Sequence, residues 1–431
     1  MSTPVHPVAE DAILFHAGFH KTGTTALQSA FASSRVELAE TGVCYPGELR
    51  SHHRAAMAVT GRTWGWEKRG GRPPRDIYWD ELVAEAVAHP GRVVIDSEAF
   101  ALASDDALDE IVGQLGADRL HAVLTLRPFA RLMASSYQQY LKYGLAMPFP
   151  EWLENVFADP PECPPSPNFW RRNDHAGVIE RWTARLGPER VTVVVLDDAD
   201  RDGMYRTFEA LLGLPDGLLV PDPAISAGNR SMTAAESEML RLVNASGARD
   251  WDWPDYQNAI RRGAVMRMVE NRTPARDEPR LDTPAWAVAA AQAVGQATAG
   301  RIGALGVTVV GDLSRLADPI PAGEFASVTL LPVQAAVEAL LGAIEGVRSA
   351  APTQDDIDRA VGRAVQRAEV RAEARGGRRA VAALGTREAA RLLRERIGQA
   401  GRRRLGMQAR PERPARERRG STSEDGAQSD S

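Results

Sequence analysis

Residues 16–25 combine small, hydroxyl-bearing and basic side chains in an order that suits phosphate binding. The segment reads His-Ala-Gly-Phe-His-Lys-Thr-Gly-Thr-Thr, with Lys21 between Gly18 and Gly23. Glycines allow a tight turn and let the backbone approach an anion closely. An apolar run precedes the segment and a helical pattern follows it, so the amides at a helix N-terminus would face the ligand. The segment is therefore predicted to bind a phosphate group.

The spacing differs from that of a nucleoside triphosphatase loop, which reads Gly, four residues, then Gly-Lys-Ser/Thr. Gly18 and Gly23 keep the glycine spacing, but Thr24 occupies the lysine position and Lys21 lies three residues earlier. Neither the lysine nor a Mg²⁺ partner is then placed for a triphosphate. This arrangement of residues favours a ligand with a single 5′-phosphate that carries a transferable group.

The loop resembles the 5′-phosphosulfate loop of sulfotransferases that use 3′-phosphoadenosine 5′-phosphosulfate (PAPS). It is most similar to a bacterial branch that reads His-x-Gly-x-x-Lys-Thr-Gly-Thr-Thr followed by Leu-Gln, here Leu27 and Gln28. The resemblance covers residues 10–245 and implies transfer of a sulfuryl group from PAPS to an acceptor hydroxyl or amine. Lys21 would stabilise the leaving phosphate. The residues implied in binding the donor are Lys21, Thr22, Gly23, Thr24 and Thr25.

A second anchor would distinguish PAPS from ATP by binding its 3′-phosphate. The family uses an Arg at a strand end and a Ser eight residues later. Arg127 ends a predicted strand here, and Ser135 follows at that spacing in a predicted helix. Arg can offer a phosphate a bidentate hydrogen bond, and Ser one hydroxyl. Lys142 continues the pattern of the bacterial branch, whereas Pro128 departs from the Arg-Asp-Pro of better-known members.

A base must remove the proton of the acceptor. Glu98 is the first candidate, because it follows a predicted strand where several relatives carry a catalytic Glu or His; a helix-start or surface carboxylate is the alternative. His53 is the second, since a neutral imidazole is a suitable base near pH 7; a solvated loop histidine is the alternative. His20, inside the loop, is the third. The scheme requires no metal.

Alternating strand and helix patterns would position these residues. Strands are expected at 12–16, 93–95, 122–126, 191–196 and 307–310. Continuous apolar strands that alternate with helices predict an α/β fold, here a P-loop-like parallel sheet flanked by helices with a mainly helical C-terminal extension.

Composition predicts the domain boundaries within the 431 residues. We expect a sulfotransferase-like α/β domain, its mainly helical completion, an Arg/Ala-rich helical extension and a disordered tail, at 10–245, 246–350, 351–410 and 411–431. A narrow apolar stripe in the extension suits a partner helix.

Charge and composition exclude several classes of protein. The net charge is −5, although residues 371–420 alone carry +11. A general nucleic-acid binder is not expected, whereas the basic tail suits an acidic partner. Two cysteines, Cys44 and Cys163, exclude a disulfide framework and fit a reducing compartment. Neither a secretory signal nor a transmembrane segment is expected, and a cytoplasmic location is predicted.

The acceptor and the exact function stay open. Aromatic and basic residues alternate over 64–79, which suits a sugar ring or an acidic acceptor, with a surface loop as the alternative. A small-molecule or glycan acceptor is expected by family analogy, and the oligomeric state is unknown. Two rivals to a PAPS-dependent sulfotransferase are a P-loop small-molecule kinase, for which Asp96 would hold Mg²⁺, and a non-catalytic nucleotide-binding module.

Overall fold

The structure is a computed structural model that describes residues 5–63, 73–158, 169–200, 202–220, 230–325 and 328–350. The chain divides into two compact units, Met1–Arg348 and Ser349–Ser431. The second unit is described at its first two residues. The predicted Arg/Ala-rich extension and tail, Cys163 and the Trp64–Arg72 part of the aromatic stretch lie outside the described residues. The predicted domain boundaries remain predictions.

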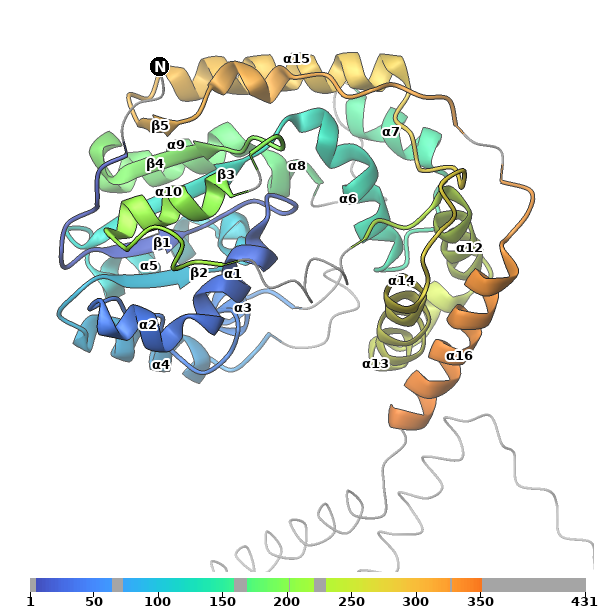
Figure 1. Ribbon diagram of the computed structural model, residues 1–431, viewed down its shortest axis with the longest axis horizontal. Coiled ribbons are helices and arrows are strands. Elements are labelled where there is room, and N and C mark those ends of the chain that lie inside the picture. The colour runs from blue at the N-terminus through green and yellow to red at the C-terminus, as the bar shows by residue number, and fades with distance from the viewer. Residues whose placement is uncertain are drawn as a thin grey trace, which may run out of the picture. The chain divides into compact units, whose positions relative to one another are not determined.

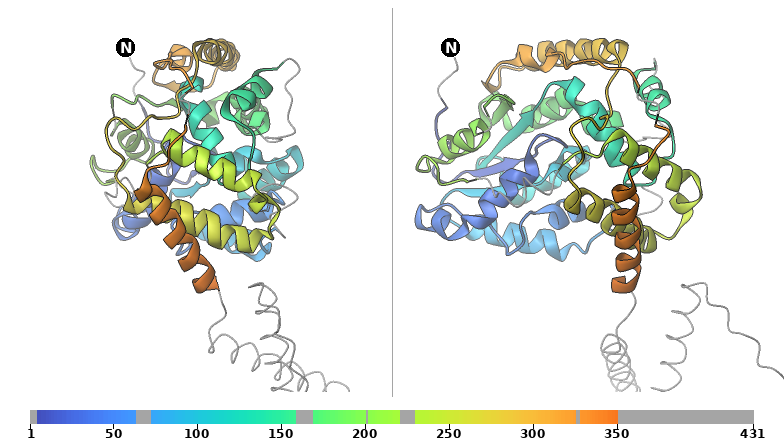
Figure 2. Two further views of the ribbon diagram at one scale, coloured as in Figure 1. Left: turned by 90° about the vertical axis from the view of Figure 1, so that its right-hand side faces the viewer. Right: turned by 45° about the vertical axis from the view of Figure 1, so that its right-hand side comes forward.

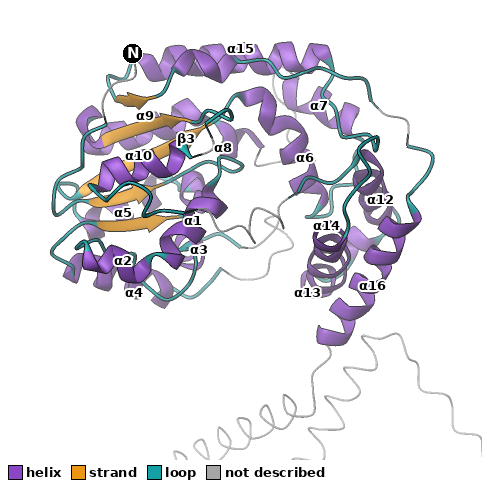
Figure 3. Ribbon diagram, viewed as in Figure 1, coloured by secondary structure: helices purple, strands orange, loops and turns teal. Residues whose placement is uncertain are grey.

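Five parallel strands form one sheet in the order β2-β1-β3-β4-β5 (Figures 1 and 3). They are β1 (Ile13–His16), β2 (Val93–Asp96), β3 (Leu120–Leu126), β4 (Val191–Val195) and β5 (Thr308–Val310). Phe15 of β1 pairs with Ile95 of β2 and Ala122 of β3. The first four strands are almost wholly buried, as expected of apolar strands covered on both faces. The five expected strands and the α/β fold class are confirmed.

Helices cover both faces of the sheet. Leu14 faces the core shared with three helices, α1 (Thr24–Ser33), α2 (Arg35–Glu40) and α10 (Gly203–Leu212). Phe15 faces the opposite core, in which its ring lies 4.4 Å from that of Phe100 and 5.1 Å from that of Trp182. The helices on that side are α3 (His53–Val59), α4 (Ile77–Ala88), α5 (Asp105–Leu115) and α9 (His175–Leu186).

A helical layer adjoins the sheet and has its own core around Trp152 and Tyr256 (Figure 2). Its helices are α6 (Leu132–Leu141), α7 (Phe149–Phe157), α8 (Phe169–Asn173), α12 (Ala234–Ala245), α13 (Trp253–Tyr256), α14 (Met266–Asn271), α15 (Ala285–Gly303) and α16 (Val333–Ala350). A π-helical segment, Gln257–Val265, joins α13 to α14. Such segments are rare and often occur at functional sites. No helix within the described ranges is long and apolar enough to cross a membrane.

The strand order determines where a ligand is expected. In a parallel sheet of order 2-1-3-4-5, ligands bind outside the carboxyl ends of the strands, at the switch point between β1 and β3. His16 ends β1 and Leu126 ends β3. The phosphate loop follows β1, and Arg127 follows β3. The topology therefore brings both predicted anchors to one edge of the sheet.

Candidate active site

The phosphate loop, residues 17–23, connects β1 to α1. Lys21 and Gly23 both adopt left-handed backbone conformations, with φ of 69° and 83°. For a lysine this costs on the order of 1–3 kcal/mol, a strain found mainly at functional sites. Gly23 caps α1 without a side-chain hydrogen bond, so the first amides of the helix can serve a ligand. Thr24 and Thr25 begin the helix, the former buried and the latter partly exposed.

A buried chain of hydrogen bonds fixes the loop to the sheet. The Thr22 hydroxyl donates to the carbonyl of Phe19 (2.6 Å) and therefore accepts from Thr125 Oγ1 at 2.8 Å. Thr125 Oγ1 must then accept from His16 Nε2 (3.1 Å), whose Nδ1 lies 3.0 Å from Asp96 Oδ1. The hydrogen bond between His16 and Asp96 completes the chain at the end of β2. Thr22 acts here by holding the loop, since its hydroxyl hydrogen is already donated within the chain.

Glu98 lies directly beyond β2, next to the loop. Its Oε2 accepts a hydrogen bond from Gln28 Nε2 (3.1 Å), and its Oε1 lies 3.8 Å from His53 Nδ1. Burial alone would raise the pKa of Glu98, but His53, His20 and the Gln28 hydrogen bond together lower it. The carboxylate is therefore ionised at neutral pH. Its charge partly offsets the burial that lowers the pKa of Lys21, a side chain that solvent still reaches.

The two histidine candidates lie beside Glu98. His53 begins α3, and its Nδ1 is also 3.3 Å from Ser97 Oγ. Burial lowers the pKa of His53, so its imidazole is neutral at pH 7. Burial likewise lowers the pKa of His20 to about 3, and its buried Nε2 has no hydrogen-bond partner in the described part of the chain. The fold thus brings all three candidate bases near Lys21.

The second anchor touches the loop directly. Arg127 donates from Nη1 to the carbonyl oxygen of Lys21 (3.2 Å) and from Nη2 to Asp198 Oδ1 (2.5 Å). Its Nε is buried and has no partner among the described residues, but the side chain is 35% exposed, so the guanidinium can still meet an anionic ligand. Ser135 lies in α6, where its hydroxyl bonds to two carbonyls of the preceding turn at 3.3 and 3.2 Å. Arg127 is therefore poised for an anion, whereas Ser135 is engaged inside its helix.

Further cations, to which no role was assigned from the sequence, surround the loop. Burial, together with the charges of Lys21, Arg261 and Arg230, lowers the pKa of Lys142 to about 7. Arg261 also lowers the pKa of Lys21 and of His53. Like charges held this close favour an anionic ligand. Arg261 comes from the π-helical segment, far along the chain, so no local sequence signal could have identified it.

Two other expectations concern side chains around the site. Trp79 lies in the stretch that was expected to form either an acceptor surface or a surface loop. It is buried and donates from Nε1 to Gln114 Oε1 at 2.7 Å, so it belongs to the core. Tyr78 is partly exposed. Among the described residues, no group of three or more His, Cys, Asp or Glu side chains could hold a metal ion.

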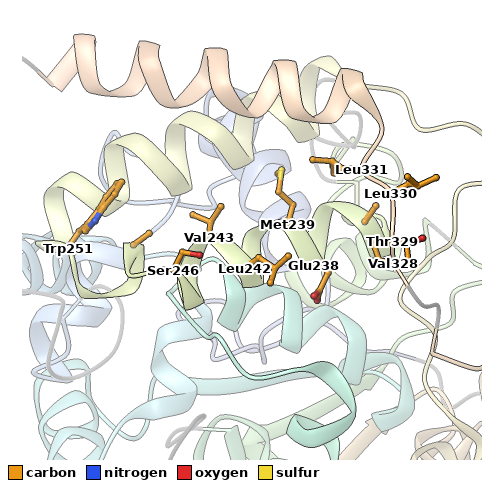
Figure 4. Close-up of a pocket in the computed structure, with 12 residues that line it drawn as sticks. Glu238, Met239, Leu242, Val243, Ser246, Trp251, Val328, Thr329, Leu330 and Leu331 are labelled. Atoms are coloured by element: carbon orange, nitrogen blue, oxygen red, sulfur yellow. The ribbon is translucent and has the colours of Figure 1, made fainter.

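A separate pocket of about 500 Å³ lies between α12 and residues 328–331 (Figure 4). Leu242, Met239 and Leu330 are among its mainly apolar lining residues. None of the candidate site residues lines it, so it is distinct from the phosphate loop.

Comparison with known proteins adds little to what the residues of the site show. No family model and no curated protein match the sequence. The solved structure of a sulfotransferase from Alicyclobacillus acidocaldarius is similar, with 16% identity and a TM-score of 0.35, over 58% of this chain and 100% of that one. The function is therefore argued from the residues described above.

Proposed function

We propose that this chain is a PAPS-dependent sulfotransferase. The observation that carries the proposal is the contact between the two anchors, in which Arg127 Nη1 donates to the carbonyl of Lys21. A loop that suits one phosphosulfate and a cation that suits a second phosphate thereby meet at one point. PAPS carries both of these anionic groups on one ribose, the phosphosulfate at the 5′ position and the phosphate at the 3′ position.

The reaction follows from the placement of the charged groups. The acceptor oxygen attacks sulfur, the bond between sulfur and the bridging oxygen breaks, and adenosine 3′,5′-bisphosphate leaves. Lys21 and the N-terminal amides of α1 stabilise the negative charge that grows on the leaving phosphate. Glu98, ionised and fixed by Gln28, accepts the acceptor proton. The strained, prearranged loop supplies orientation, on which a loose transfer of this kind depends.

The rival kinase function is less well supported. A kinase needs a carboxylate that can reach a solvated Mg²⁺ ion. Asp96, the residue that would serve, is fully buried, and its Oδ1 is engaged by His16 and Gln28 at 3.0 and 3.4 Å. The non-catalytic alternative has no specific observation in its favour.

Calorimetric titration tests the donor. Wild type should bind adenosine 3′,5′-bisphosphate more tightly than AMP, and Arg127→Ala should erase that preference, a loss of roughly 10–150-fold for a charged hydrogen bond. Arg131→Ala is the matched control, because Arg131 Nε also binds Asp198 (2.6 Å) but Arg131 was assigned no role in donor binding. Tighter binding of ATP with Mg²⁺ would favour the kinase.

Turnover tests the reaction itself. Wild type incubated with ³⁵S-labelled PAPS and a panel of hydroxyl and amine acceptors should release the bisphosphate and label an acceptor. Lys21→Met should retain the fold and lose this activity. Donor binding without turnover on the whole panel would favour the non-catalytic module.

A further inference from the structure

Helix α16 has one face made of small residues, which packs on the π-helical segment and α14. Ala335 and Ala339 are buried in this contact. A Cβ atom at Gly342 would collide with the backbone of Gly263, and one at Gly346 with that of Asn258. The backbones therefore approach as closely as glycine allows.

Ion pairs fix the rotation of α16 about its axis. Arg267 Nη1 of α14 donates to Glu345 at 2.9 Å, and Arg267 Nε lies 2.9 Å from Glu338 Oε2 in an ion pair. These pairs bridge two turns of α16, and together with the glycine contacts they determine which side chains point outward. In Figure 2, α16 lies at the edge of the helical layer.

The outward face carries a regular apolar stripe. Its residues and exposed fractions are Val333 78%, Val337 46%, Leu340 63%, Ile344 46% and Val347 40%. They follow one another at intervals of four, three, four and three residues, which is the spacing of a coiled-coil seam. At 3.6 residues per turn they occupy an arc of roughly 80°. Stripes of this size on a protein surface mark interaction sites.

We propose that this stripe pairs with α16 of a second copy of the chain, giving a two-fold dimer. A two-fold interface places the same patch on both partners, so a heptad stripe is complementary to itself. Of the flanking positions Gln334, Ala336, Leu341, Ala343 and Arg348, only Arg348 is charged, so the stripe is not bordered by a row of like charges. The exposed fractions correspond to about 500 Å² per copy. Burial of all of this surface would cover about 1,000 Å² per pair, the least expected of a biological interface.

A membrane surface is a less suitable occupant. Helices that lie on membranes flank their apolar face with many basic residues. The exposed polar residues near this stripe are Gln334, Glu345 and Arg348, which carry no net positive charge. The dimer is independent of the proposed activity, because α16 contributes no residue to the candidate site.

Light scattering coupled to gel filtration of the full chain tests the proposal. Wild type should have twice the chain mass of 46.7 kDa. The double variant Leu340→Glu/Ile344→Glu should have the mass of one chain. Both side chains are about half exposed in one copy, so the variant should stay folded, which circular dichroism checks. Val36→Glu on α2, where Val36 is 70% exposed, is the matched control and should stay dimeric.

Each alternative result overturns the proposal. A monomeric wild type at 100 µM would show that α16 does not self-associate, and flotation of that monomer with phosphatidylserine vesicles would assign the stripe to membranes. A double variant that remains dimeric would place the interface elsewhere.

Discussion

Lys142 provides a quantitative test of the anion site. It follows the last turn of α6 and is partly buried, and its side-chain ammonium makes no hydrogen bond or ion pair with another described residue. Burial, Lys21, Arg261 and Arg230 lower its pKa to about 7. In the ligand-free protein at pH 8, Lys142 is therefore about one-tenth protonated, whereas an ordinary lysine is fully charged.

Binding of adenosine 3′,5′-bisphosphate should change that protonation. The phosphate charges offset the repulsion from Lys21 and Arg261, so the pKa of Lys142 rises toward its ordinary value. Because the bound state then holds more protons than the free state, the protein takes up about 0.9 proton at pH 8 and about 0.1 at pH 6. The affinity should accordingly weaken as the pH rises from 7 to 9.

Calorimetry in buffers of different ionisation enthalpy measures the uptake directly. Lys142→Gln should abolish the uptake at pH 8, and so should Lys142→Arg, which keeps the charge and should retain most of the affinity. An uptake below about 0.2 proton at pH 8 in wild type, or an equal uptake in Lys142→Gln, would refute the reasoning.

Three further substitutions test the base, the buried network and the packing. Glu98→Gln should lower kcat by roughly 10²–10⁴-fold, and an unchanged kcat would reject Glu98 as the base. Thr22→Val should lower the free energy of unfolding by about 1–3 kcal/mol in urea titrations. Thr41→Val, which removes a surface hydroxyl bonded to Leu38, should change it by less than about 0.5 kcal/mol; equal losses would count against the network. Gly295→Ala places a Cβ against the carbonyl of Leu316 and should destabilise by about 1–3 kcal/mol. Gly300→Ala, in open space on the same helix, should stabilise by up to about 1 kcal/mol, so equal signs would contradict the packing.

The sheet could be predicted from the sequence because its strands are continuous apolar runs. All five runs are strands, with boundaries that differ by at most two residues. Gly23 was expected in the turn and has the positive φ that only glycine adopts readily. Gly18 is needed for another reason: a Cβ there would collide with the His16 ring, whose position no local pattern reveals.

Adjacent residues with the same side chain can take opposite roles, which spacing alone does not determine. His52 is buried; its Nδ1 accepts from the Asp96 amide (3.0 Å) and its Nε2 donates to the Pro46 carbonyl (2.9 Å). His53, one residue later, begins α3 and faces Glu98. The difference depends on how the helix start meets the end of β2. Neither an acceptor surface nor a surface loop describes Trp79, because its burial depends on contacts with α5 that the local sequence does not reveal.

Arg127 shows that spacing can predict where a residue lies on the sheet edge but not which residues it contacts. The eight-residue interval predicted a shared site with Ser135, yet the backbone of α6 already satisfies that hydroxyl. Asp198, which follows β4, instead holds the guanidinium. One oxygen binds Arg127 and the other binds Arg131, so the carboxylate fixes the direction of the first without using its Nε. A partly exposed guanidinium that a carboxylate holds in place is prearranged for an anion, and that arrangement depends on three strands meeting at one edge.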